Sequence, residues 1–206
     1  FAGLSSIMSN LADNQAESLV MVGSTEITIG ESTHITLPVI RLTAKVHLTK
    51  IVNNMELQHN KDQDFSLTAV YLINVVGERQ YIGNATNPSV WYNKMLYEPG
   101  SPDVLFDSLN DVALDDGEKY DTQHYFYCYP NSCTTDTNGG NWTNRKTRLV
   151  VEVKMGETTY YYPITLPELI ANTLYKVSLN ITRPGATSPD APLNLESAKF
   201  KVEVVE

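Results

Sequence analysis

The chain has 206 residues, a length that suits one large β domain or two small domains with a sizeable core. No apolar stretch approaches the roughly 20 residues that a membrane-spanning helix needs, so we expect no transmembrane segment in this chain. The 24 acidic and 15 basic residues give a formal net charge of -9, which repels phosphate backbones and argues against a nucleic-acid partner.

The first predicted strand lies within residues 35–49, where apolar side chains recur at every second position. Its inward face is Leu42, Ala44, Val46 and Leu48, and its outward face is Arg41, Thr43, Lys45 and His47. The same period predicts a second strand over residues 65–75. Its inward face is Phe65, Leu67, Ala69, Tyr71, Ile73 and Val75. A short third strand is expected at 125–129.

The second half of the chain continues the strand pattern. Strands are predicted at 149–154 and 158–164, and the tight turn between them indicates a β-hairpin. The last two inward faces are Tyr175, Val177, Leu179 and Ile181, and then Phe200, Val202 and Val204. One or two helical turns are expected at 87–96 and a single turn at 166–170, and long surface loops at 97–121 and 131–147. This pattern predicts an all-β, antiparallel β-sandwich with at most one or two short helical turns.

The only two cysteines are Cys128 and Cys133, which flank the turn-forming pair Pro130-Asn131. Such a turn can bring two cysteines within disulfide distance, so we expect a bridge between them. Two free thiols that are close in sequence remain the alternative. One pair of cysteines supplies only half of a zinc site, and no second pair lies nearby.

The sequence assembles no set of catalytic residues. The four histidines are scattered, and none has the spacing of a metal ligand pair; they are His34, His47, His59 and His124. The oxygen-rich loops at 115–121 and 136–141 fit a solvated acidic loop better than a calcium loop with a closing glutamate. The basic run 144–148 is interpreted as loop charge. We therefore expect no enzymatic activity and no cofactor.

Six segments carry a resemblance when they are taken in order: 41–48, 65–74, 124–131, 147–153, 160–164 and 172–185. The first of them holds the motif strand Arg41, Leu42, Ala44, Lys45 and Val46. Together the six segments resemble the fimbrillins of Bacteroidales type V pili. The stretch they cover resembles the C-terminal domain of a stalk subunit.

The resemblance implies two transthyretin-like β-sandwich domains. Residues 1–40 would be the closing strands of an N-terminal domain, and residues 41–206 the C-terminal domain. It also implies export through the outer membrane, a place in a cell-surface fimbrium, and polymerisation by donor-strand exchange. The partners would be other fimbrial subunits, as a self-polymer or with tip and anchor proteins. Both ends of the chain look cut, so we expect a piece of a longer precursor.

A second hypothesis is a surface adhesin that binds a glycan or a host protein. Its contact residues would be Trp91, Tyr92, Trp142 and the tyrosines of 125–129, although a core position is equally consistent with these aromatic residues. The triplet Asp107-Ser108-Leu109 fits the O-glycosylation pattern of exported Bacteroidetes proteins. Ser108 is therefore a candidate acceptor.

Overall fold

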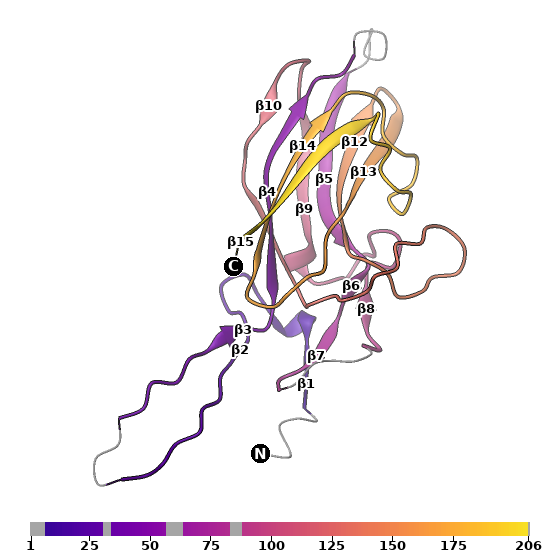
Figure 1. Ribbon diagram of the computed structural model, residues 1–206. Coiled ribbons are helices and arrows are strands. Elements are labelled where there is room, and N and C mark those ends of the chain that lie inside the picture. The colour runs from indigo at the N-terminus through magenta and orange to yellow at the C-terminus, as the bar shows by residue number, and fades with distance from the viewer. Residues whose placement is uncertain (1–6, 31–33, 57–63, 83–87, 206) are drawn as a thin grey trace.

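The chain folds as a sandwich of two β-sheets, seen in a computed structural model that describes residues 7–30, 34–56, 64–82 and 88–205 (Figure 1). The first sheet consists of β4 (Ala44–Asn53), β10 (Lys119–Tyr120), β11 (His124–Cys128), β14 (Leu174–Ile181) and β15 (Ala198–Val205). The second sheet, in spatial order, consists of β13 (Thr158–Thr165), β12 (Arg148–Met155), β5 (Phe65–Ile73) and β9 (Phe106–Ala113). The prediction of a β-sandwich is confirmed.

The order of strands in the first sheet is set by β4 at its centre. Strand β14 pairs with β4 in parallel, and β15 pairs with the far side of β14 in the antiparallel sense. Strands β10 and β11 share the other side of β4, and both are antiparallel to it. The second sheet is antiparallel throughout. The sandwich is thus antiparallel except at one central pair.

The core lies between the two sheets, where the predicted inward faces meet. On β14 the inward residues are 0–1% exposed: Tyr175, Val177, Leu179 and Ile181. Alternate residues of β12 join the same cluster, because every second side chain of a strand points to the same face. The predicted hairpin of β12 and β13 is also confirmed, and Gly156 in its turn has φ 54°, a conformation that glycine adopts without strain.

The motif strand is confirmed on its inward side, since Leu42, Ala44, Val46 and Leu48 are all buried. On the outward side Thr43 is an exception, because the turn at Asn172 covers it and donates a backbone N–H to its carbonyl at 2.9 Å. Strand β4 also extends beyond the predicted end. A register shift at Thr49 lets the inward row resume at Ile51.

The predicted single inward face of β5 is wrong, because a bulge divides the strand. Thr68 has no partner on either neighbouring strand, so the faces exchange on its two sides. The main core contains Phe65, Leu67, Val70 and Leu72. A smaller cluster on the outer side of the second sheet contains Ala69, Tyr71 and Ile73, with Val150 from β12. One strand therefore serves two apolar clusters.

Both predicted helical turns are wrong. Residues 91–92 form the short strand β8 (Trp91–Tyr92), and Leu169 makes an isolated bridge with Asn131. The helical turns of the described residues are instead η2 (Leu11–Asp13) and η3 (Asp103–Leu105). No helix in the described ranges is long and apolar enough to cross a membrane. The predicted loop 97–121 contains the edge strand β9 (Phe106–Ala113). Its many polar side chains interrupt the alternation of apolar and polar residues by which a strand is recognised in the sequence.

Three short pairs extend one end of the sandwich (Figure 1). They are β1 (Met8–Asn10) with β7 (Glu78–Gln80), β2 (Met21–Val22) with β3 (Ile40–Arg41), and β6 (Val75–Val76) with β8. Leu11 beside β1 is buried in the main core. Residues 23–30 and 34–39, between β2 and β3, project away from the sandwich as two extended segments, which we call the arm (Figure 1).

Candidate functional site

The candidate functional site is β15, the outermost strand of the first sheet (Figure 1). Its predicted inward face is the β15 row: Phe200, Val202 and Val204. The prediction that this row is buried is wrong, since Phe200 is 36% exposed, Val204 is 48% exposed and Val202 is only half-buried. The molecule therefore presents a line of apolar side chains at the margin of its core.

The exposure of the β15 row follows from its position at the margin of the sandwich. Cross-strand partners share a face, and Leu179, Val177 and Tyr175 of β14 are paired with Phe200, Val202 and Val204. The β14 residues are fully buried in the main core, whereas on β15 only Val202 packs against that core in part and Phe200 and Val204 are exposed. Strand β15 also has one unpaired backbone edge, because β14 is its only strand neighbour among the described residues.

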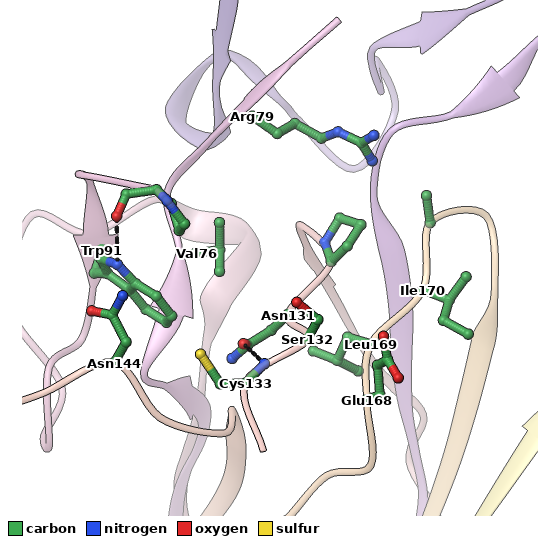
Figure 2. Close-up of a pocket in the computed structure, with 13 residues that line it drawn as sticks. Val76, Arg79, Trp91, Asn131, Ser132, Cys133, Asn144, Glu168, Leu169 and Ile170 are labelled. Carbon is green, nitrogen blue, oxygen red and sulfur yellow. Dashed lines mark hydrogen bonds between the residues drawn. The ribbon is translucent and has the colours of Figure 1, made fainter. Parts of the chain in front are cut away.

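A pocket of about 480 Å³ lies near the end of the sandwich that carries β6, β7 and β8 (Figure 2). Figure 2 shows Trp91, Val76 and Cys133 on one side, with Leu169 and Ile170 on the other. Polar groups of Asn131, Ser132, Asn144 and Glu168 also line it. The pocket combines apolar walls with hydrogen-bonding groups, a composition common to small-molecule and sugar sites.

The aromatic residues of the adhesin hypothesis are largely engaged within the fold. Trp91 Nε1 donates to the Pro88 carbonyl at 3.1 Å, and Trp142 Nε1 donates to Asn74 Oδ1 at 3.2 Å. The two indole rings meet edge to face with centroids 5.3 Å apart. The Tyr92 hydroxyl donates to Asn10 at 2.7 Å. Only Trp91 of these residues lines the pocket.

The two cysteines are free thiols in this structure, which differs from the predicted disulfide. Cys128 is buried in the core at the end of β11. Cys133 lines the pocket (Figure 2). The backbone of Asn131 forms a β-bridge with Leu169, and the side-chain oxygen of Asn131 accepts the Cys133 backbone N–H at 3.0 Å. These two contacts hold Cys133 at the wall of the pocket. Burial raises the pKa of the Cys128 thiol to about 12 and also raises the pKa of Cys133.

The interpretation of run 144–148 as loop charge is wrong, because Arg145 and Arg148 are fully buried. They form the arginine cluster with Asp136 and Asp190. Arg145 Nη1 lies 3.1 Å from Asp190 Oδ2, and Arg148 Nη1 lies 3.2 Å from Asp190 Oδ1. Arg148 also pairs with Asp136, whose other oxygen accepts from the Thr165 hydroxyl. The cluster joins the 131–147 loop to the connection between β14 and β15.

No three His, Cys, Asp or Glu side chains gather into a possible metal site within the described ranges. His124 contacts Asp107 Oδ2 at 2.8 Å and the Tyr120 hydroxyl at 2.8 Å, which links the two sheets at one edge. His59 lies outside the described residues. In the acidic loop, Glu118 accepts the Asp115 backbone N–H at 3.0 Å.

Ser108 lies exposed on β9, an edge strand of the second sheet. Its hydroxyl contacts Asn110 Oδ1 at 3.2 Å. The hydroxyl is therefore accessible to a modifying enzyme, and O-glycosylation of Ser108 stays a prediction.

Comparison with known proteins finds likeness at the level of structure. No protein-family model and no curated protein sequence matches the chain. A proposed cell adhesion protein from Bacteroides eggerthii superposes with a TM-score of 0.75 at 19% identity, over 100% of this chain and 70% of that one. A proposed cell adhesion protein from Parabacteroides distasonis gives 0.65 at 16% identity, over 99% and 76%. A fimbrilin from Porphyromonas gingivalis W83 gives 0.64 at 17% identity, over 99% and 74%. The predicted resemblance is thus confirmed in the architecture, and this chain has the fold of Bacteroidales fimbrilins and proposed cell adhesion proteins.

Proposed function

We propose that this chain is a structural, non-catalytic subunit of a cell-surface fimbrium that polymerises by strand exchange between neighbours. The fold shared with a fimbrilin supports the fimbrial role. The observation that carries the assembly mechanism is the exposed apolar row on the free edge of β15. A strand added there would pair with the open backbone edge and cover the β15 row.

The two edges of the second sheet, β9 and β13, are protected against strand addition. On β9, Asn110 and Asp111 have positive φ values of 52° and 55°, and the strand is bulged. On β13, Tyr161 exchanges two backbone hydrogen bonds with Ala186, each 2.8 Å long, and Pro163 has no N–H to donate. Bulges, proline and covering loops are the devices that block edge pairing. Strand β15 lacks these three devices. Strand β11, at the other margin of the first sheet, also has a free side, but its inward residues Phe126 and Cys128 are buried, so only β15 combines a free edge with an exposed apolar row among these strands.

The domain division belongs to the same proposal, with residues 1–40 as closing strands of an N-terminal β domain and 41–206 as the C-terminal domain. The projecting arm and the adjoining strand β3 support it, because six of their apolar side chains are at least half exposed. They are 50–83% exposed: Ile27, Ile29, Ile35, Leu37, Val39 and Ile40. Such a set of exposed apolar residues is typical of a surface that packs against another element.

The test compares filament formation by variants of the full-length protein after export and after the proteolytic trimming near the N-terminus that the fimbrillin resemblance implies. The double variant Phe200→Asp/Val204→Asp places charges on the β15 row, and we expect it to stay monomeric because a charged row rejects an apolar strand. The matched control is Ile170→Asp/Leu195→Asp, which changes two exposed apolar residues elsewhere. Electron microscopy and detergent-resistant ladders on gels should show filaments for the wild type and the control.

Two results would overturn the proposal. Filaments from the Phe200→Asp/Val204→Asp variant would show that assembly does not use β15. A trimmed wild type that stays monomeric while it binds a glycan saturably would favour the adhesin hypothesis instead. The pocket beside Trp91 is the observation that keeps this second function in view, and Asn144→Ala would then be expected to weaken glycan binding.

A further inference from the structure

The outer face of the first sheet gathers most of the lysines of the chain. Six of the ten lysines lie there: Lys45, Lys50, Lys119, Lys176, Lys199 and Lys201. The pairing register places them together. Lys50 and Lys201 both flank Ser178, and Lys176 lies between His47 on β4 and Glu203, the one acidic residue of β15. Because these positions lie on the side of the sheet that faces away from the second sheet, we define them as the lysine face.

Most of the charge on the lysine face is not neutralised within the chain. Lys119 pairs with Asp121 at 3.1 Å, and Lys201 pairs with Glu203 at 3.4 Å. For the other four lysines, no carboxylate of the described residues lies within ion-pair distance. Like charges on neighbouring strands repel, so an external anion would relieve this repulsion. The face is therefore locally positive although the chain carries -9.

The aromatic side chains on this face support the lysines. Lys45 Nζ lies 3.9 Å from the centroid of the Tyr125 ring and 5.6 Å from that of Tyr127. The His47 ring lies 4.5 Å from the Tyr125 ring. Burial lowers the pKa of His47. The hydrogen bond with Gln123 raises this pKa, and the positive charges of Lys45 and Lys176 lower it further. His47 is thus mostly neutral at pH 7, and the lysines supply the charge.

We propose that the lysine face binds an acidic polysaccharide, a chain that carries repeated sulfate or carboxylate groups. The lysines extend over neighbouring strands of one sheet, and an extended polyanion can contact several at once and release its counterions. A protein partner fits less well, because lysine is depleted at the centre of protein interfaces. Nucleic acid fits less well too, because arginine is the residue of choice for its recognition, whereas the cationic side chains of this face are lysines.

The test measures the affinity of the folded chain for immobilised heparin as the sulfated probe and polygalacturonate as the carboxylate probe, over a range of salt concentrations. The face variant is Lys176→Gln/Lys199→Gln/Lys201→Gln. The control variant is Lys94→Gln/Lys146→Gln/Lys154→Gln, which has the same net charge but alters lysines outside the face. Thermal unfolding establishes that both variants are folded.

We expect the wild type and the control variant to bind at low salt with similar affinity. The face variant should bind at least roughly tenfold more weakly, and its plot of log Kd against log salt should be shallower by about three, one for each lysine removed. No binding by the wild type, or equal weakening in both variants, would overturn the proposal. Tighter binding to a DNA duplex, or salt-sensitive self-association lost in the face variant, would assign the face to nucleic acid or to a second copy instead.

Discussion

Strands β14 and β15 are neighbours with the same alternation of apolar and polar residues, yet they differ in what covers them. Val177 on β14 is fully buried, whereas Val204 on β15 is 48% exposed. Both side chains point to the same face, as the pairing of Tyr175 with Val204 shows. The alternation of apolar and polar residues therefore determines which face of the sheet a side chain points to. It does not determine whether the second sheet covers that side chain.

The largest expected difference in stability between the two strands comes from introducing one aspartate on each of them. We expect Val177→Asp to lower the free energy of unfolding by about 5 kcal/mol, because it buries an unpaired carboxylate. Val204→Asp should cost less than about 1 kcal/mol, since water reaches the side chain. Urea unfolding followed by circular dichroism measures both. Equal losses would break the comparison and place the β15 row in the core.

A smaller effect tests how the connection between the two strands is held. Asp190 lies in that connection and faces two buried arginines. We expect Asp190→Ala to cost about 3–4 kcal/mol, because it leaves both guanidinium groups buried without a carboxylate between them. The control is Glu196→Ala in the same connection, where the side chain is 75% exposed and pairs with Arg183. Its expected cost is under about 1 kcal/mol by the same urea measurement. A similar loss of unfolding free energy in the two variants would contradict the idea that the buried ion pairs of Asp190 hold this connection.

The smallest effect concerns the two thiols and contrasts a core position with a position at the pocket. In the native protein Cys133 should react with a thiol reagent well before Cys128, because Cys128 is buried and its raised pKa leaves little thiolate below pH 8. Titration of the denatured, unreduced protein provides the control and should find two thiols. A count of zero would instead establish the disulfide predicted from the sequence.

The strands whose inward rows meet the opposite sheet could be predicted from the sequence, as for Val46 on β4. The bulge at Thr68 could not, because an unpaired residue leaves no mark in the composition of β5. Strand β9 was hidden because an edge strand keeps polar side chains on both faces.

The site was less predictable than the fold. The final strand could be located from its alternation, but its exposure depends on which strands lie across the core. The buried state of Arg145 could not be predicted, because its partner Asp190 is 45 residues away in the sequence. The lysine face was equally hidden, since its members come from four strands that are adjacent only after folding.

The parallel pairing of β4 with β14 has a consequence for the order of folding events. Thr49 on β4 donates its hydroxyl to the Val177 carbonyl, which is 128 residues further along the chain. The central strand of the first sheet thus acquires its second neighbour only when the chain up to Ile181 is available. Closure over such a separation is entropically costly and slow, so the first sheet is completed late, after the chain up to Ile181 has left the ribosome.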